Sequence, residues 1–391
     1  MEDAAPSDWR PVVAYAALSA ANQMLWLTYT PITTDAGHHY GVSSGAIGWL
    51  AEIFPLLYVV LALPAGRLID RDLPLWLGAG AVLTGAGGLL RLVGDAYLPV
   101  LAGQVLVAVA QPLVLNAVTR MSRRYLHADD RAAGIAVSSA GVFAGMLLAL
   151  VLGAAFGGSH IPALVAVQAV LATLAAIGLC AALRRRPVGA DAPSGPGAPP
   201  RPMWADRYLR LLLALVCVGF GVFIALTTWL QTLLDPAGVS ETQAGVLLLI
   251  MVVAGVGGSA VLPPVLARRQ AEFGFLLTSV VGTGAALVVL AVAPGMGTGV
   301  IVLLVVGALL LTDLPVVLEL AERRAGAAGG TASALVWLAG NAAGLVVALA
   351  VQGLLDHPAL AFGLLAAVNL AGVPLLLALR RAARTEPVPA G

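Results

Sequence analysis

The sequence predicts an all-α membrane protein with twelve transmembrane helices in two pseudo-symmetric six-helix bundles. The first observation is composition: the 391 residues are 60% hydrophobic and only 10% charged, whereas a soluble domain carries about 25% charged residues. The second is that the apolar residues form long runs, and a spanning helix needs about 20 of them. The third is a polar segment in the middle of the chain, which divides the runs into two equal sets.

Each run is taken in chain order. The first six cover 11–31, 45–65, 74–93, 97–119, 131–157 and 161–183, and the second six cover 209–234, 242–267, 274–293, 297–320, 328–354 and 359–379. The segment between the sets is rich in Pro, Gly and Ser, a composition that cannot bury enough apolar surface to fold. We therefore expect an N-terminal bundle over 1–183, a flexible cytoplasmic linker over 184–207 and a C-terminal bundle over 208–391.

The placement of arginine predicts the orientation. The chain contains no lysine, so all 21 basic residues are arginine, and all except Arg91 fall on one side of the predicted bundle. Because cytoplasmic loops carry the excess of basic residues, both termini are expected in the cytoplasm and the chain in a plasma or inner membrane. The net charge of +1 gives no indication of a nucleic-acid partner, and none is expected.

The two halves resemble each other in sequence. Residues 41–50 read GVSSGAIGWL and residues 238–247 read GVSETQAGVL, and each stretch begins the second run of its half. Chance similarity is the alternative, because Gly, Val and Leu are common in this chain. The matching positions favour parallel repeats of the kind found in secondary transporters.

A loop motif follows the second run. Residues 66–71 read GRLIDR, which resembles the G-x-L-x-D-R-x-G-R signature of the major facilitator superfamily, although the later Gly and basic residue are missing. The resemblance implies a major facilitator fold. It also implies a gating role for Gly66, Asp70 and Arg71, with the Asp paired to a helix end and an Arg. The alternative is an ordinary polar loop that obeys the positive-inside rule.

In the fold that the motif implies, the first, fourth, seventh and tenth helices of the chain line a central cavity. On the first run, Asn22, Trp26 and Tyr29 share one helical face, and Gln104 and Gln111 share a face on the fourth. Tyr29 fits an interfacial aromatic belt equally well. Gln104 is as consistent with a helix-to-helix contact as with a ligand contact, whereas Gln111 favours the cavity.

The second half supplies four more candidates for binding the solute: Gln231 on the seventh run, Asp313 on the tenth, and Trp337 and Asn341 on the eleventh. A carboxylate in the middle of a bilayer costs roughly 2.5–3.5 kcal/mol on insertion scales. Asp313 is therefore expected to be a counter-ion for a cationic solute or a proton carrier. The alternative is a protonated Asp bonded to a neighbouring helix.

Two packing expectations concern the first half. Gly141 and Gly145 are four residues apart and predict close helix packing, but the Pro found here in proton-coupled drug antiporters is missing. Glu52 is expected near Arg91, as a possible ion pair.

Three blocks in the first half, NQMLWLTY at 22–29, YGVSSGAIGWL at 40–50 and GQVLVAVAQP at 103–112, resemble the feline leukaemia virus subgroup C receptor-related transporters. This resemblance implies transport of choline and ethanolamine, with haem as an older assignment. It places the Trp and Gln that contact the ammonium group on Trp26 and Gln111, and a further Gln on Asn341. The family's Tyr on the seventh helix falls near Ile224, so that aromatic side chain is lost.

Together these features predict a secondary transporter that moves a small choline- or ethanolamine-like cation by alternating access. Haem is disfavoured because no His lies within a predicted span. The alternatives are a proton-coupled exporter of drugs or metabolites and a membrane receptor that does not transport. No nucleophile, metal or cofactor constellation occurs, so we expect no enzyme activity, no cofactor and no metal site, and we expect a monomer.

Overall fold

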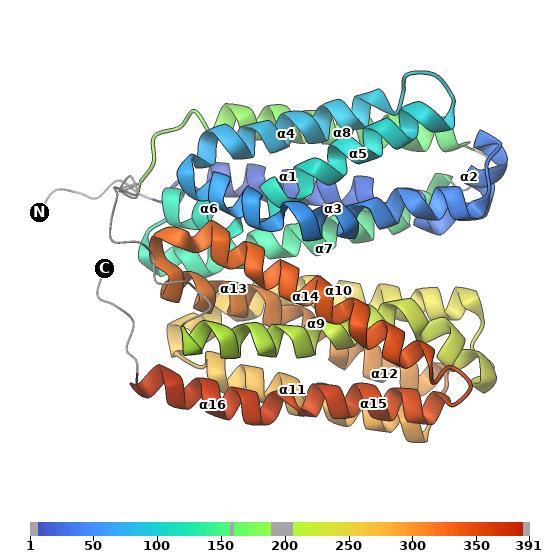
Figure 1. Ribbon diagram of the computed structural model, residues 1–391, viewed down its shortest axis with the longest axis vertical. Helices are drawn as coiled ribbons and strands as arrows, with labels where there is room; N and C mark the ends of the chain where they lie inside the picture. The colour runs from blue at the N-terminus through green and yellow to red at the C-terminus, as the bar shows by residue number, and fades with distance from the viewer. Residues whose placement is uncertain (1–6, 157–159, 189–205, 386–391) are drawn as a thin grey trace, which may run out of the picture. The chain divides into compact units, whose positions relative to one another are not determined.

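The computed structural model describes residues 7–156, 160–188 and 206–385, so most of the predicted linker, residues 189–205, lies outside the described residues. The described chain is helical and contains no strand. It divides into two compact units, of which the first comprises Met1–Gly195 with Ala327–Ala334 and the second comprises Pro196–Gly326 with Leu335–Gly391. Each unit is described separately below (Figure 1).

The first unit is built mainly from six long helices. Its helices are α1 (Trp9–Trp26), α2 (Thr33–Tyr40), α3 (Ser44–Arg71), α4 (Leu73–Leu90), α5 (Tyr97–Leu115), α6 (Val118–Tyr125), α7 (Arg131–Phe156) and α8 (Ile161–Ala182). α1 packs against α5, α7 and α8, and α4 packs against α5 and α8. α1 therefore contacts three of the other long helices of its unit.

The second unit contains the remaining helices. They are α9 (Arg207–Leu234), α10 (Glu241–Arg269), α11 (Glu272–Val292), α12 (Met296–Val306), the π-helix η6 (Gly307–Leu311), α13 (Thr312–Ala325), α14 (Gly329–Gln352), α15 (Pro358–Leu370) and α16 (Gly372–Thr385). α12, η6 and α13 follow one another without a break as one span, Met296–Ala325. The first turn of α14 belongs to the first unit by its contacts.

Within the described residues, eleven segments are long and apolar enough to cross a membrane, and α1 is not among them. α1 carries Ser19, Asn22 and Gln23, which lower its hydropathy, yet all three are buried inside the first unit. With α1 as the first span, the arrangement agrees with the twelve predicted helices. The chain is thus an all-α, multi-pass membrane protein.

The prediction of close packing at Gly141 and Gly145 is confirmed. A Cβ on Gly141 would lie 2.6 Å from the backbone carbonyl oxygen of Ala16. A Cβ on Gly145 would collide with the carbonyl oxygen of Ala20, one turn further along α1. The two glycines therefore let the α1 and α7 backbones touch, which fixes the position of α1 in the unit.

Candidate functional site

Asn22 is a structural link within the first unit. Its side chain is fully buried, and its Nδ2 donates to the hydroxyl oxygen of Thr84 at 3.4 Å and to the carbonyl oxygen of Val107 at 3.2 Å. One amide thus joins α1 to α4 and α5. Because these donors are already used, Asn22 helps to position α1 in the unit.

Trp26 is held at the last residue of α1 and is half-buried. Its indole Nε1 donates to the carbonyl oxygen of Ala51 on α3 at 2.9 Å. The ring stacks on Phe54 with 6.0 Å between centroids and an interplanar angle of 28°. The indole orientation is therefore fixed by one hydrogen bond and one aromatic neighbour.

The two glutamines of α5 differ in their hydrogen bonding. The Gln104 amide is fully buried and donates to the carbonyl oxygens of Leu25, Trp26 and Leu50 at 3.1, 3.4 and 3.2 Å. Gln104 is therefore the α5 glutamine that lies beside Trp26, and it joins α5 to α1 and α3. Gln111 is only 4% exposed, and none of the described hydrogen bonds involves its amide.

Tyr29 belongs to an aromatic and basic cluster just after α1. It is 2% exposed, its hydroxyl lies 3.5 Å from that of Tyr40, and the Arg91 guanidinium lies 5.2 Å from its ring centroid. Burial, reinforced by the neighbouring Tyr29, raises the pKa of Tyr40 above its usual value, so this phenol stays neutral. The expected pairing of Glu52 with Arg91 is wrong, because Arg91 is buried over an aromatic ring while Glu52 is exposed.

Three candidates lie on α9 and α14 of the second unit. Trp337 is 7% exposed and meets Phe220 edge to face, with 5.5 Å between centroids. Asn341 is half-buried and donates to the Trp337 carbonyl oxygen one turn earlier at 2.8 Å. Gln231, in contrast, is exposed. Trp337 and Asn341 therefore share one stretch of α14, while no described hydrogen bond brings Gln231 to them.

Asp313 turns toward α11. Its Oδ2 accepts a hydrogen bond from the Ser279 hydroxyl at 2.7 Å. No described hydrogen bond or ion pair joins Asp313 to Trp337 or Asn341. The described hydrogen bond therefore joins α13 to the neighbouring helix α11, and the expected roles of counter-ion or proton carrier stay predictions.

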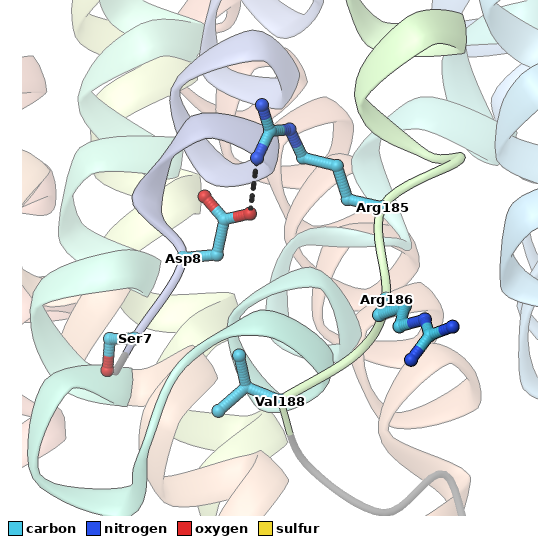
Figure 2. Close-up of a pocket in the computed structure, with 5 residues that line it drawn as sticks. All are labelled: Ser7, Asp8, Arg185, Arg186 and Val188. Atoms are coloured by element: carbon cyan, nitrogen blue, oxygen red, sulfur yellow. Dashed lines mark hydrogen bonds and ion pairs between the residues drawn. The ribbon is translucent and has the colours of Figure 1, made fainter. Parts of the chain in front are cut away.

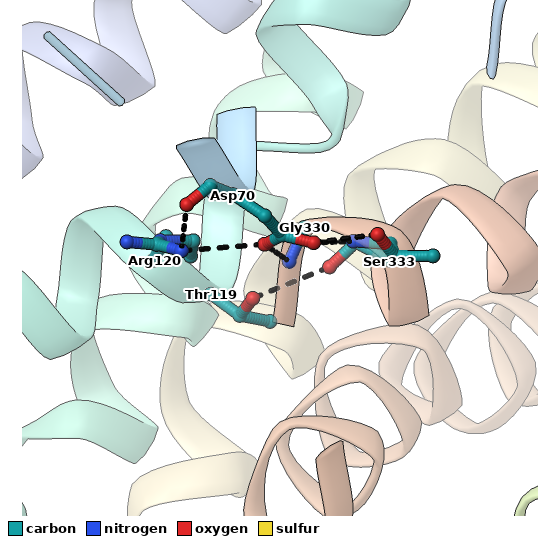
Figure 3. A network of polar contacts seen from close by, with 6 residues as sticks. Asp70, Thr119, Arg120, Gly330 and Ser333 are labelled. Atoms are coloured by element: carbon teal, nitrogen blue, oxygen red, sulfur yellow. Dashed lines mark hydrogen bonds and ion pairs between the residues drawn. The ribbon is translucent and has the colours of Figure 1, made fainter. Parts of the chain in front are cut away.

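Asp70, near the end of α3, is the most highly connected of the predicted residues (Figure 3). Its Oδ1 accepts from the backbone N–H of Gly330 at 2.8 Å, and its Oδ2 accepts from the N–H and the hydroxyl of Thr331 at 2.9 and 2.5 Å. Arg120 on α6 donates to the Asp70 carbonyl oxygen at 2.9 Å and to Oδ1 at 3.4 Å. The carboxylate therefore occupies the N-terminus of α14, where the helix dipole favours a negative charge.

Gly66 makes this approach possible. A Cβ at this position would lie 2.9 Å from both the Gly330 carbonyl oxygen and the Ala334 Cβ. Next to this contact, Thr119 and Ser333 lie with their hydroxyl oxygens 3.3 Å apart (Figure 3). Arg71 is exposed, so the basic partner of Asp70 is Arg120 of α6, which the sequence motif did not identify.

A further polar link was not predicted from sequence. The Tyr58 hydroxyl donates to the Asn116 Oδ1 at 2.7 Å, and the Asn116 Nδ2 donates to the Ala62 carbonyl oxygen at 2.9 Å. Asn116 directly follows Leu115, the last residue of α5. A buried amide just after a Pro-containing helix was the available signal.

The first unit also has an open surface pocket, which none of the predicted residues lines. It is bordered by Ser7, Asp8, Arg185, Arg186 and Val188, with Arg185 paired to Asp8 at 3.1 Å (Figure 2). Among the described residues, no group of three or more His, Cys, Asp or Glu side chains is placed to hold a metal ion.

Comparison with known proteins identifies a family match over most of the chain. The family model described as Major Facilitator Superfamily matches residues 12–348. A *Danio rerio* protein named Solute carrier family 49 member A3 is 29% identical over 269 residues, covering 63% of this chain and 56% of the relative. The chain thus spans little more than half the length of that relative.

A human protein named Choline/ethanolamine transporter FLVCR2 is 29% identical over 126 residues, covering 31% of this chain and 24% of the relative. Among solved structures, the *E. coli* fucose:proton symporter FucP has a TM-score of 0.73 at 15% identity, covering 95% of this chain and 99% of that one. A bacterial homologue of the iron transporter ferroportin has a TM-score of 0.72 at 15% identity, covering 96% and 98%. At these identities the solved structures support the fold alone.

Proposed function

The chain belongs to the major facilitator superfamily, and from that premise we propose that it transports a small organic cation of the choline or ethanolamine kind. The supporting observation is the fixed indole of Trp26, which lies in the block NQMLWLTY at 22–29. Part of the chain is also similar to the human protein named Choline/ethanolamine transporter FLVCR2. The proposed mechanism is alternating access, in which the two halves rock around a central site. The protein would act as a monomer in the cell membrane with both termini in the cytoplasm.

In this proposal the indole of Trp26 receives the ammonium group. A cation over an indole face gains roughly 0.5–2 kcal/mol, and more when it is desolvated. Phe54 stacks on the indole, so the cation would use the opposite face. The hydrogen bond from Nε1 to Ala51 would hold the ring in place before the solute binds, so little conformational entropy of the ring would be lost on binding.

Gln111 is the proposed polar contact for the solute in the first unit. It is buried on α5 and outside the described hydrogen bonds, whereas Gln104 and Asn22 are committed to backbone carbonyl groups. Tyr29, Gln231, Trp337 and Asn341 remain proposed contacts. Asp313 is left out of the solute site because its carboxyl is bonded to Ser279 on α11.

The gating proposal rests on Asp70 and Gly66, with Arg71 as the exposed last residue of the same helix; the motif expected in a loop lies within α3. The four hydrogen bonds that the Asp70 carboxylate accepts would hold the first turn of α14 to α3 and α6. We propose that these bonds form and break during the transport cycle.

Uptake into proteoliposomes tests the substrate class. Radiolabelled choline, ethanolamine and fucose are compared at one pH, with protein-free liposomes as the blank. The proposal expects saturable uptake of at least one of the two amines and none of fucose. Fucose uptake without amine uptake, or no amine uptake with the gradient imposed in either direction, would contradict it.

A further inference from the structure

The span that carries Asp313 is interrupted by a π-helix. Residues Gly307–Leu311 form this segment between α12 and α13, and Asp313 follows two residues later. Such single-turn π segments occur frequently at functional sites. The interruption lies in the middle of the Met296–Ala325 span.

The local sequence explains part of this geometry. Pro315 has no N–H to donate to the carbonyl oxygen of Leu311 four residues earlier. Ser259 of α10 supplies a substitute donor, with its hydroxyl 3.1 Å from that oxygen. On the same side, Gly258 lets α10 approach closely, because a Cβ there would lie 2.8 Å from the Ala308 carbonyl oxygen. The α10 side of the π segment is therefore tightly packed and hydrogen-bonded.

The α11 side is different. Asp313 has one described hydrogen bond, from Ser279, and its Oδ1 is buried with no hydrogen-bond partner among the described residues. Thr283 lies one turn beyond Ser279 on α11, and its hydroxyl is likewise buried without a hydrogen-bond partner in the described chain. Two buried hydroxyl groups thus lie one turn apart on α11, and the first of them is bonded to the carboxyl.

The charged and titratable groups on the helices that pack against α13 are engaged elsewhere or lie near helix ends. Arg323 pairs with both Glu272 of α11 and Glu319, and Arg324 pairs with Asp206. Cys217 of α9 donates to the Ala339 carbonyl oxygen. The others are Arg207, Tyr208, Arg210, Arg268, Arg269 and Glu322. Ser279 is the described hydrogen-bond partner of the Asp313 carboxyl, and none of the ion pairs among the described residues includes Asp313, so no described cation balances an ionised form.

We propose that Asp313 and Ser279 form a proton-binding site, which takes one proton from water and returns it during each transport cycle. The carboxylate plus a proton gives the neutral carboxylic acid, so no other reactant is required. A buried carboxyl without a balancing cation favours the neutral form, and access to water restores the charged one. This inference adds proton coupling to the proposed function, but the site itself does not depend on which solute is carried.

The π segment offers a physical link between protonation and helix position. Converting a π turn to an α turn shifts the following residues by one position, a rotation of about 100° about the helix axis. Such a shift would carry Asp313 away from Ser279. Because the Ser259 hydroxyl of α10 is hydrogen-bonded to the Leu311 carbonyl oxygen in the π segment, the rearrangement would also move α10.

Infrared difference spectroscopy of the purified full-length protein tests the site without any solute. Spectra at alkaline pH minus acidic pH are compared for wild type, Asp313→Asn and Thr278→Ala, an exposed hydroxyl on α11 that donates to the Gly274 carbonyl oxygen. We expect a carboxylic-acid carbonyl band that disappears with rising pH in wild type and Thr278→Ala and is missing in Asp313→Asn. A band that Asp313→Asn does not remove would overturn the proposal. A band that is lost in Asp313→Asn but constant over the pH range would also overturn it, by showing a permanently neutral structural carboxyl.

Coupling is measured in proteoliposomes containing a pH-sensitive dye, with choline as the added solute. Wild type is expected to move protons when choline is added, and Asp313→Asn to lose at least nine-tenths of that signal while still exchanging labelled for unlabelled choline. Ser279→Ala is expected to shift the midpoint of the pH profile, and Thr278→Ala to leave it unchanged. Choline transport without proton movement would overturn coupling. If choline is not transported at all, the solute proposal fails, while the infrared result still decides the proton site.

Discussion

The Asp70 carboxylate accepts a hydrogen bond from the backbone N–H of Gly330 at 2.8 Å, although 260 positions separate the two residues in the chain. The same carboxylate also accepts two hydrogen bonds from Thr331. A helix N-terminus has unpaired N–H groups and a partial positive charge. Asp70 satisfies both at the start of α14, so this residue of α3 links the two helices within the first unit.

Asp70→Asn is expected to slow solute uptake by roughly ten- to hundredfold, because hydrogen bonds to a charged group contribute about 1.5–3 kcal/mol. The Asn amide keeps the shape of the Asp carboxylate but replaces one of its two accepting oxygens with an NH2 group, which donates. Initial rates of uptake into proteoliposomes measure the effect. Asp72→Asn is the matched control, because Asp72 caps α4 through Leu75 and Asn caps helices as well as Asp does. Equal rates for the two variants would show that the charge at Asp70 has no role in transport.

Gly66→Ala is expected to lower both the melting temperature and the uptake rate. The added methyl group would lie 2.9 Å from the Gly330 carbonyl oxygen, so α3 and the start of α14 must move apart. Gly48→Ala on the same helix is the control, because a Cβ there meets nothing within 4 Å. Thermal unfolding in detergent compares the two. If Gly66→Ala unfolds at the temperature of Gly48→Ala, the close contact does not contribute to stability.

The two glutamines of α5 are expected to respond differently to replacement by leucine. Gln104→Leu removes the donor shared by three buried carbonyl oxygens, and each unsatisfied buried group costs about 1–3 kcal/mol. Its melting temperature should therefore fall. Gln111→Leu should keep the wild-type melting temperature and lose most choline uptake. A stable, fully active Gln111→Leu protein would remove that residue from the proposed site.

Much of the fold could be predicted from the sequence because spanning helices are read from composition and length alone. The predicted run 161–183 and the helix Ile161–Ala182 differ by one residue. Two short helices were not predicted. α6, with the sequence VTRMSRRY, falls mostly between the predicted runs 97–119 and 131–157. α2 falls between the runs 11–31 and 45–65. Apolar length gives no signal for either helix.

The direction in which a side chain points was harder to predict. Helical spacing predicts that Asn22 and Trp26 share one face of α1, but it does not show that Asn22 is bonded to Thr84 and Val107. When a spanning helix is apolar on all sides, its sequence does not show which side faces the protein and which faces the lipid. For Asp313, the π turn before it also changes the side of the helix on which the residue lies. Nothing in the sequence except Pro315 marks this irregularity.

Choline uptake by Trp26 variants tests the central claim most directly. Wild type, Trp26→Phe, Trp26→Ala and the exposed control Trp49→Ala are reconstituted at equal protein content, and saturable uptake of radiolabelled choline is measured. The account predicts uptake by wild type and Trp49→Ala, reduced affinity in Trp26→Phe, and at least a tenfold loss in Trp26→Ala, since an aromatic face is then missing. Full choline uptake by a folded Trp26→Ala protein would contradict the account.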